Sequence, residues 1–371
     1  MKFTVKKGLF LDVMSKIQGI TSRKSSLSIT ETVLIDARGS NISLSATDLE
    51  TGFLGAYPAN VETDGSIALN SKKLFEIIRD FPSEEICFNE IEEAWIEIGN
   101  EQVQYHIVGM NPEDFPEIPK IETVGHFQIN AIHFSRMIEK ATSIPAPSDD
   151  KRAHINGIYF EPIKTKNDWL KMVSTDGSRL ITVECRLDHP MPSPFETGVL
   201  VPKKGLSEVK KFLDPDGSVE ICFQHNNFIV KNKSETIIIR LLEGNFPEYS
   251  EIVDKEGCHS TAINRALFLM MLKRMSILSS DAYKGVIFYI KPDQLTIMTT
   301  NPDIGESKED MEIEYGGESL EMAFNPRYFI DLMNVIEDDQ IIMSLINEER
   351  PCFIEGEMDK SFLNVIMPMR L

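Results

Sequence analysis

Residues 170–178, LKMVSTDGS, decide the fold, because their pattern occurs twice more in the chain. It recurs as ISLSATDLE at residues 42–50 and as LTIMTTNPD at residues 295–303. Each copy alternates apolar and polar residues, which predicts a strand with one buried face that ends in a Thr-Asp or Thr-Asn turn. The turn threonines are 128 and 125 residues apart: Thr47, Thr175 and Thr300. A repeat of this length indicates tandem domains, since solenoid units are far shorter.

Two amphipathic helices flank the strand in every copy. A short strand runs into the first helix in residues 3–17, 127–141 and 260–275. The second helix has a polar or proline-containing start and occupies residues 69–81, 201–213 and 324–336. Between the two helices, the sequence of each copy contains short β-branched segments separated by Gly, Asn or Asp turns. Each copy is therefore predicted to be α+β, with two helices packed on antiparallel β-sheets.

The repeat also has a closing element. Residues 105–118 and 238–252 each combine a strand, a turn and Phe-Pro-Glu, whereas the third copy ends with FLNVIMPMRL at residues 362–371. Boundaries near residues 124 and 255 follow, in polar or glycine-containing segments. The predicted domains are residues 1–124, 125–255 and 256–371.

The composition is that of a folded protein, with 42% hydrophobic and 26% charged residues in 371. No apolar run approaches the 18 or more residues that span a membrane. Residues 1–5, MKFTV, alternate like a strand and do not resemble a signal peptide, so a cytoplasmic protein is expected. Five widely spaced cysteines are expected to be reduced structural thiols.

The net charge of −20 argues against a nucleic-acid partner unless the basic residues are clustered. The six predicted helices together carry +8, which leaves −28 for the rest of the chain. Helices tolerate Lys and Arg better than strands do, so this bias alone is ambiguous. Its recurrence in the repeat favours a shared basic face that meets phosphates without reading sequence.

Specific catalytic and cofactor motifs are absent from the sequence. It contains no GxxxxGK[ST], GxGxxG, HExxH or GxSxG, and the seven histidines show no paired spacing. The sequence therefore predicts no metal, no cofactor and no catalytic residue. Two alternatives to a DNA-binding protein remain open: an enzyme on the same scaffold, and a protein-interaction hub that never meets DNA.

The chain end, VIMPMRL at residues 365–371, is apolar although chain ends are generally polar. A terminal strand in its own sheet explains Val365 and Ile366, and the two methionines beside a proline offer an adaptable surface for peptides. Together with MKFTV, ATDLE at 46–50, INGIYFE at 155–161, STDGSRL at 174–180 and EGNFPEY at 243–249, this end resembles the bacterial DNA polymerase III beta subunit, the sliding clamp.

The resemblance covers essentially the whole chain and implies three clamp domains that close as a head-to-tail homodimer into a ring around double-stranded DNA. It implies a processivity factor that is not itself an enzyme and needs no cofactor. The partners implied are the polymerase III catalytic subunit, the clamp loader, and other polymerases and repair proteins with a clamp-binding motif.

The resemblance also implies a partner-peptide pocket between the second and third domains. Its residues are Ile155, Thr175, Gly177, Ser178, Arg179, Leu180, Pro247, Ile252, Val365, Ile366, Met367, Pro368, Met369, Arg370 and Leu371. Apolar walls would take Leu or Phe anchors, and Arg179 and Arg370 would meet peptide carbonyls or carboxylates. Ser178, Glu251, Glu349 and Pro351 depart from the family pattern and are expected to shift the preferred peptide away from acidic flanks.

The DNA contacts are expected on basic helix residues and on two loops, one around Arg23 and one at residues 149–154. These residues are Arg23, Lys24, Lys72, Lys73, Arg136, Lys140, Lys151, Arg152, His154, Lys203, Lys204, Lys210 and Lys211. His154 replaces a tyrosine that is common in the family. At the ring seam, the residues expected to meet are Tyr105 and Ile107 of one chain and Ile277 and Leu278 of the other.

Overall fold

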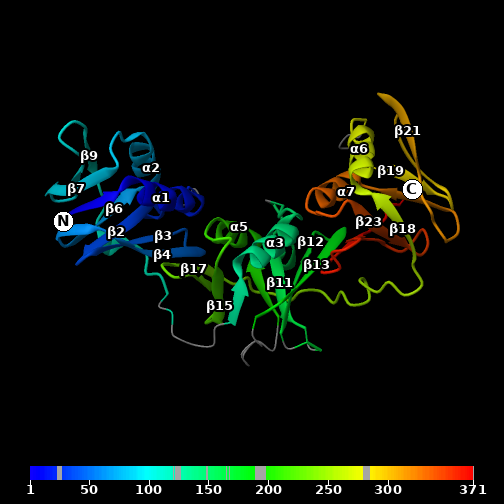
Figure 1. Ribbon diagram of the computed structural model, residues 1–371, viewed down its shortest axis with the longest axis horizontal. Helices are drawn as coiled ribbons and strands as arrows, with labels where there is room; N and C mark the ends of the chain where they lie inside the picture. The colour runs from blue at the N-terminus through cyan, green and yellow to red at the C-terminus, as the bar shows by residue number, and fades with distance from the viewer. Residues whose placement is uncertain are drawn as a thin grey trace. The chain divides into compact units, whose positions relative to one another are not determined.

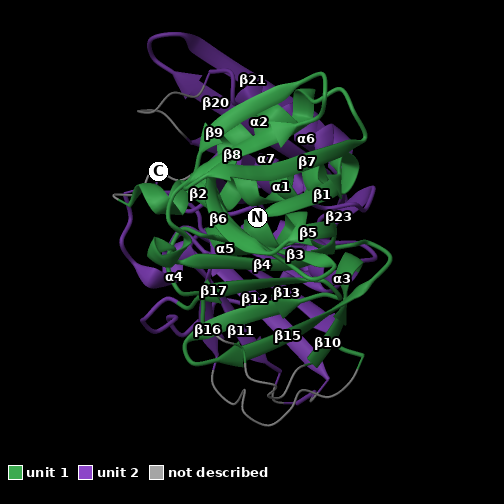
Figure 2. Cartoon of the chain, turned by 90° about the vertical axis from the view of Figure 1, so that its left-hand side faces the viewer, with its two compact units in different colours: residues 1–132, 187–195, 204–241 green, residues 133–186, 196–203, 242–371 purple. Residues whose placement is uncertain are grey.

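The computed structural model describes residues 1–22, 27–119, 121, 127–147, 149–163, 165–166, 168–188, 198–278 and 285–370. The chain forms two compact units (Figures 1 and 2). Unit 1 comprises residues 1–132, 187–195 and 204–241, and unit 2 comprises residues 133–186, 196–203 and 242–371. The domain boundary predicted near residue 124 lies outside the described residues, and the one near residue 255 stays a prediction.

Unit 1 contains two antiparallel sheets. Its strands are β1 (Lys2–Lys6), β2 (Thr32–Arg38), β3 (Asn41–Thr47), β4 (Thr51–Pro58), β5 (Asn60–Thr63), β6 (Gly65–Asn70), β7 (Glu85–Glu92), β8 (Trp95–Gly99), β9 (Gln104–Val108), β10 (Phe127–Asn130), β15 (Ser218–Gln224), β16 (Asn227–Lys231) and β17 (Glu235–Arg240). The five-stranded sheet has the order β5-β1-β7-β8-β9, and the eight-stranded sheet has the order β10-β15-β16-β17-β4-β3-β2-β6. The pairing of β17 with β4 joins strands from two predicted domains.

Three helices pack against the eight-stranded sheet of unit 1: α1 (Lys7–Thr21) contacts β3 and β4, α2 (Ser71–Asp80) contacts β2 and β6, and α5 (Lys203–Lys211) contacts β17. A Cβ added at Gly205 on α5 would lie 2.8 Å from Ile239 of β17, so the helix and the strand approach closely. Ile238 points to the opposite face because side chains alternate along a strand. There it packs against Ile118 and Ile121 of the first linker, residues 115–121.

Unit 2 also contains two antiparallel sheets. Its strands are β11 (Gly157–Pro162), β12 (Trp169–Thr175), β13 (Arg179–Arg186), β14 (Val199–Pro202), β18 (His259–Asn264), β19 (Val286–Ile290), β20 (Gln294–Asn301), β21 (Gly305–Glu312), β22 (Leu320–Phe324), β23 (Gln340–Leu345), β24 (Cys352–Gly356) and β25 (Phe362–Ile366). The eight-stranded sheet has the order β14-β11-β12-β13-β25-β24-β23-β18, and the four-stranded sheet has the order β21-β20-β19-β22. The β13–β25 pair again joins two predicted domains.

The helices that belong mainly to unit 2 are α3 (Ala131–Thr142), α4 (Ala153–Asn156), α6 (Arg265–Met275) and α7 (Pro326–Met333). Phe268 of α6 packs edge-on against Phe329 of α7, with ring centroids 5.8 Å apart. The second linker, residues 246–253, covers the eight-stranded sheet, where Tyr249 joins a buried cluster with Leu180 and Val365.

Asparagine side chains start four of the helices. The side-chain oxygens of Asn70, Asn130, Asn264 and Asn325 accept hydrogen bonds of 3.0 Å from backbone N–H groups in the first turn of α2, α3, α6 and α7. These groups have no partner inside a helix, so an asparagine cap stabilises its start. The polar helix starts seen in the sequence therefore have a physical role.

One backbone bridge recurs in all three copies of the repeat. A backbone N–H after the closing strand donates to a carbonyl of the strand before the second helix, at 2.7–2.9 Å. The pairs are Met110 with Ala68, Leu242 with Leu200, and Met369 with Ala323. This shared bridge confirms the predicted α+β repeat at the level of hydrogen bonding.

The repeat also shows local differences from the sequence prediction. Strands β3 and β12 end at Thr47 and Thr175 as predicted, but β20 continues to Asn301. The helical turn α4 lies in the segment that was expected to be a loop. No described helix is long and apolar enough to cross a membrane, and all five cysteines are free of disulfides.

Candidate functional site

The STDGSRL motif forms a tight turn between β12 and β13. The Thr175 hydroxyl accepts from the Gly177 N–H at 3.0 Å and donates to the Arg179 carbonyl at 2.7 Å. The Asp176 carboxylate accepts from the N–H groups of Ser178 and Arg179 at 3.0 and 3.1 Å. Gly177 has φ +90°, which glycine adopts without a steric penalty. The motif thus fixes the backbone of the predicted pocket.

Arg179 is buried at 7% exposure and is held by two carboxylates. Its guanidinium lies 3.0 Å from Asp176 and 2.9 Å from Asp331 on α7. The guanidinium carbon is 4.4 Å from the centroid of the Tyr328 ring, a cation–π contact. Its donors thus bind acids of this chain and position the turn, and a contact of Arg179 with a peptide stays a prediction.

The floor of the predicted pocket is a buried apolar cluster. Leu180 pairs with Val365 across β13 and β25, and both pack with Val173, Tyr249 and Phe353. Burial and a hydrogen bond from the Tyr249 hydroxyl to Glu161 raise the pKa of Tyr249. The cluster anchors the second linker to the sheet.

Several predicted pocket residues belong to this interior. Ile155, Leu180, Val365 and Ile366 are at most 5% exposed. They lie beneath the surface of the predicted pocket, and a direct contact with a peptide stays a prediction. Thr175 is also buried and acts through its turn.

The exposed apolar residues lie on the second linker and the chain end. Ile252, Met367 and Met369 have exposed fractions of 40%, 40% and 41%. The Met367 N–H donates to the Ser178 carbonyl at 2.9 Å, and the Met369 N–H to Ala323 at 2.7 Å, so both methionines are held in place by their backbones. Pro247 and Arg370 are exposed and Pro368 is partly buried, whereas Leu371 lies outside the described residues.

Lys203, at the start of α5, was expected to contact DNA, but its side chain is buried. It is 4% exposed, and its amine donates to the Thr175 carbonyl at 3.3 Å. Burial lowers the pKa of the amine to about 8, although Asp176 opposes this. The buried amine supports the Thr175 turn, and a contact of Lys203 with DNA stays a prediction without support from its exposure.

The other basic residues of α2 and α5 that were predicted to contact DNA lie on the helix surfaces. Lys72, Lys73, Lys204, Lys210 and Lys211 are all exposed. Lys73 pairs with a glutamate one turn away at 2.9 Å, and Lys211 does so at 2.6 Å. Among the described residues, no ion pair is found for Lys72 or Lys204. Arg23 and Lys24 lie outside the described residues.

In unit 2, two helix cations form ion pairs with residues of the third predicted domain. Lys140 of α3 binds Asp359 and has a side chain only 12% exposed, and Arg136 lies 3.6 Å from Glu337. Both residues line a cavity of about 400 Å³ between α3 and the third domain. Lys140 therefore connects two predicted domains and is poorly placed to bind a phosphate.

The segment at residues 149–154 is partly helical. Arg152 binds Asp150 at 2.6 Å, and these hydrogen bonds lower the pKa of the Asp150 carboxyl to about 2. Lys151 is exposed, whereas His154 lies in α4 with its ring edge-on to Phe246 at 6.5 Å. Half of the positive charge expected here is already neutralised within the loop.

The predicted seam residues lie at sheet and helix ends. Tyr105 and Ile107 are on β9, an edge strand that pairs only with β8. Tyr105 is 38% exposed and Ile107 is partly buried. Ile277, just after α6, is 74% exposed, and Leu278 is partly buried. Exposure of large apolar side chains at these places is typical of an interface.

Sequence reasoning missed Asp331, Tyr328 and Glu161. They act through contacts with Arg179 and Tyr249, which are distant in the chain. No local pattern in α7 or β11 indicates such a partner. An alternation of apolar and polar residues predicts which face is buried, but not which carboxylate a buried cation meets.

Comparison with known proteins agrees with this architecture. Family models match the N-terminal domain of the DNA polymerase III beta subunit at residues 1–119, its central domain at 128–248 and its C-terminal domain at 251–370. The chain is 27% identical to the beta sliding clamp of Pseudomonas putida over 375 residues and 26% identical to that of Escherichia coli K12 over 373 residues. Both alignments cover 100% of each chain.

Solved structures agree as well. The DNA polymerase III beta subunit of Pseudomonas aeruginosa is 26% identical with a TM-score of 0.91, and the sliding clamp of Bartonella birtlesii is 27% identical with a TM-score of 0.92. Each comparison covers 100% of both chains. With three family models matched in order along nearly its whole length, the chain belongs to the DNA polymerase III beta subunit family.

Proposed function

We propose that two copies of this chain close into a ring around duplex DNA and hold partner proteins on it through the exposed end of unit 2. The family is that of the beta sliding clamp, a processivity factor without catalysis of its own. The observation that supports this proposal most directly is the match of all three family domains in order along the chain. A cytoplasmic location accompanies this proposal.

A ring raises processivity because it makes rebinding of a tethered polymerase intramolecular, at an effective concentration set by the tether. Contacts between basic side chains and phosphates are non-specific and weaken with salt, so such a ring slides. Lys72, Lys204 and Lys210 are exposed on helices and are among the DNA contacts proposed. Lys73, Lys211, Arg136 and Arg152 stay in the proposed surface with part of their charge neutralised by ion pairs, and Lys151 stays in it as an exposed lysine.

Two sheet edges support a proposal for where the two copies of the homodimer meet. β9 ends the five-stranded sheet and β21 ends the four-stranded sheet, so each has one row of backbone groups without a strand partner in the described part of the chain. Edge strands of this kind pair readily with another chain. We propose that β9 of one copy adds to β21 of the other, with Ile277 packed beside the junction.

For the partner site, we propose that Ile252, Met367 and Met369 receive the apolar side chains of an extended peptide. Methionine adapts to differently shaped anchors, which suits a site with several partners. The polymerase III catalytic subunit, the clamp loader and repair proteins with a clamp-binding motif are the partners proposed. Glu251 lies next to Ile252 and disfavours acidic residues in that part of the peptide.

The test is the binding of a fluorescent Gln-x-x-Leu-Phe peptide to the intact chain and to Met367→Asp. The matched control is Met358→Asp, since Met358 is also an exposed methionine of unit 2, at 82%. We expect micromolar binding, a loss of at least tenfold in Met367→Asp and no change in Met358→Asp. A chain lacking Met369, Arg370 and Leu371 should also lose binding. Equal affinities of all four proteins would contradict the proposed site.

A further inference from the structure

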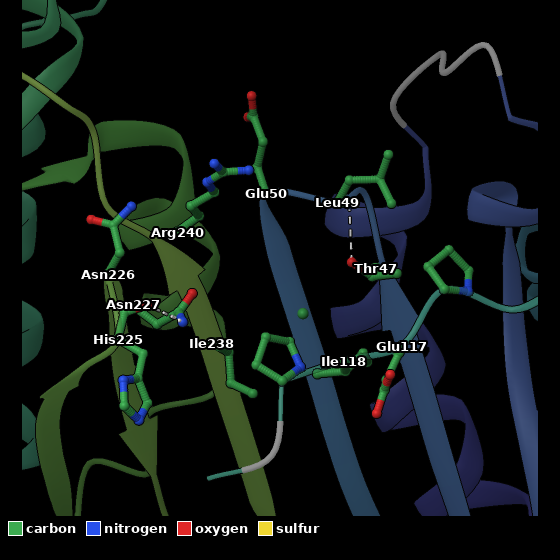
Figure 3. A pocket seen from close by; sticks show the side chains of 13 residues that line it. Thr47, Leu49, Glu50, Glu117, Ile118, His225, Asn226, Asn227, Ile238 and Arg240 are labelled. Carbon is green, nitrogen blue, oxygen red and sulfur yellow. Dashed lines mark hydrogen bonds between the residues drawn. The ribbon is translucent and has the colours of Figure 1, made fainter.

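Unit 1 has a cavity where the first linker crosses its eight-stranded sheet. The cavity lies beside the turn that corresponds, in the repeat, to the STDGSRL turn of unit 2. Its volume is about 340 Å³, within the range of ligand sites. The β3–β4 turn, the first linker, the β15–β16 turn and the end of β17 surround it (Figure 3). The residues used below are Leu49, Glu117, Ile118, His225, Ile238 and Arg240.

The turn beside this cavity is built like the STDGSRL turn. The Thr47 hydroxyl accepts from the Leu49 N–H at 3.0 Å, as Thr175 does from Gly177. The Asp48 carboxylate accepts from the N–H groups of Glu50 and Thr51 at 3.0 and 2.6 Å. The two turns therefore present their backbones in the same way.

The adjacent strand ends also correspond. The Arg240 N–H donates to the Glu50 carbonyl at 2.8 Å, as the Met367 N–H does to Ser178 at 2.9 Å. Arg240 thus occupies in unit 1 the position that Met367 occupies in unit 2. The first linker crosses the sheet with Phe-Pro-Glu at residues 115–117, as the second does with Phe-Pro-Glu at 246–248.

Leu49 distinguishes this turn and carries the inference. Its φ is +75°, in the left-handed region that is unfavourable for a leucine, whereas Gly177 has φ +90° at the equivalent position. The side chain is 51% exposed, so burial does not compensate for the strain. A strained, exposed apolar residue at the rim of a cavity is typical of a binding site.

The remaining walls are preformed. Ile118 packs against Ile238, and Pro116 and Pro119 on either side of it restrict the linker backbone. The turn residues His225 and Asn226 have φ +46° and +65°, and the Asn227 amide donates to the His225 carbonyl at 3.0 Å. A ligand therefore meets a site that needs little ordering.

The charges at the cavity indicate what fits. In Figure 3, Glu117 lies next to Ile118, whereas the Arg240 side chain lies beyond Ile238 and next to Glu50, which also lines the cavity. Arg240 and Glu117 are exposed, and within the described chain neither takes part in an ion pair. An aliphatic side chain flanked by a carboxylate and an amine is complementary to this arrangement.

We propose that this cavity is a second peptide-docking site, for an extended segment of a partner protein with an aliphatic residue between an acidic and a basic one. The aliphatic side chain packs between Leu49, Ile118 and Ile238. The carboxylate binds Arg240 and the amine binds Glu117. The proposal goes beyond the proposed function and does not depend on the site in unit 2.

The test is photo-crosslinking of the full chain with two short peptides, acetyl-Lys-photoleucine-Asp-amide and acetyl-Asp-photoleucine-Lys-amide, which cover both chain directions. Mass spectrometry locates the label. We expect at least one probe to label residues 47–52 or 115–119, with labelling saturating at micromolar to millimolar concentration. Leu49→Gly should reduce this labelling at least fivefold, whereas Leu27→Gly, with a leucine 47% exposed in the same unit, should not.

A charge reversal provides the second arm. Arg240→Glu should weaken labelling by these probes at least fivefold and favour acetyl-Lys-photoleucine-Lys-amide instead. Melting temperatures check that the variants fold. Labelling that is scattered over the surface, confined to residues 365–370, or equal in Leu49→Gly and the unaltered chain would overturn the proposal. None of these results bears on Gln-x-x-Leu-Phe binding at Met367, so failure of one site is distinguishable from failure of the other.

Discussion

The guanidinium of Arg179 lies 2.9 Å from the carboxylate of Asp331, which ties the β12–β13 turn to helix α7. Arg179 is buried, whereas the side chain of Asp331 is 41% exposed. Removing the buried member of an ion pair leaves its partners unpaired and costs about 3 kcal/mol of folding stability. Removing a half-exposed partner costs less, about 1 kcal/mol.

We therefore predict that Arg179→Ala lowers the free energy of unfolding of unit 2 by about 3 kcal/mol and Asp331→Ala by about 1 kcal/mol. Urea denaturation followed by Trp169 fluorescence, in a Trp95→Phe background, reports unit 2 alone because the chain has two tryptophans. Arg179→Lys serves as a control that keeps the charge but loses the planar contact with Tyr328. A larger loss for Asp331→Ala than for Arg179→Ala would contradict this account.

Lys203 makes stability depend on pH. Burial lowers the pKa of its amine to about 8 from 10.5, so above pH 8 the folded chain releases this proton before the unfolded chain does. The unfolded state then binds more protons, and the free energy of unfolding rises with pH between about 8 and 10. Lys203→Met should remove up to about 2 kcal/mol of this rise, since one pKa unit corresponds to about 1.4 kcal/mol.

This measurement is best made below pH 9.5. Burial and nearby glutamates raise the pKa of Tyr57 and Tyr249 in the folded chain. Their ionisation in the unfolded state lowers stability as the pH rises above 10 and opposes the effect of Lys203. Urea midpoints for the unaltered chain and Lys203→Met that run parallel from pH 7.5 to 9.5 would show that Lys203 does not titrate there.

The proposed seam predicts a change of assembly without a change of fold. Ile277 is 74% exposed in a single copy, so Ile277→Asp should cost little folding stability while placing a charge in the interface. We expect sedimentation equilibrium to show dimers for the unaltered chain and monomers for Ile277→Asp at micromolar concentration. Leu267→Asp, which alters another exposed apolar residue on α6, should remain dimeric. Equal dissociation constants for the two variants would place the seam elsewhere.

The proposed DNA surface predicts a change in salt dependence. Lys72 and Lys204 are exposed on helices, and each phosphate contact contributes about 0.9 to the slope of log affinity against log salt. Lys72→Glu with Lys204→Glu should therefore flatten the slope by about 1 to 2 and shorten retention on circular DNA. Lys231→Glu reverses one lysine on strand β16, half of the charge change in the double variant, and should leave the slope unaltered. Lys203 is excluded from this test because it is buried.

The sequence predicted the parts of this protein that depend on local or repeated chemistry. Alternation gave the strands that end at Thr47 and Thr175, and polar starts such as Asn70 gave the helices. The family resemblance placed the chain end beside the Ser178 turn. The sequence could not show that Arg179 is already bound by Asp331 or that Lys203 is buried. Both features depend on packing between segments more than 25 residues apart.

Leu49→Gly separates a binding role from a structural one. A leucine at φ +75° costs about 1 to 2 kcal/mol of backbone strain, which glycine removes. Against this gain, glycine costs about 0.5 to 1 kcal/mol through the greater entropy of the unfolded chain. It also loses about 1 kcal/mol from the partly buried leucine side chain. The free energy of unfolding of unit 1 should therefore change by less than about 1 kcal/mol. Leu27 has an ordinary φ of −105°, so Leu27→Gly should cost about 1.5 kcal/mol. Urea denaturation followed by Trp95 in a Trp169→Phe background measures both. If Leu49→Gly were as destabilising as Leu27→Gly, the strain at Leu49 would be absent, and with it the reason to assign that side chain to a ligand.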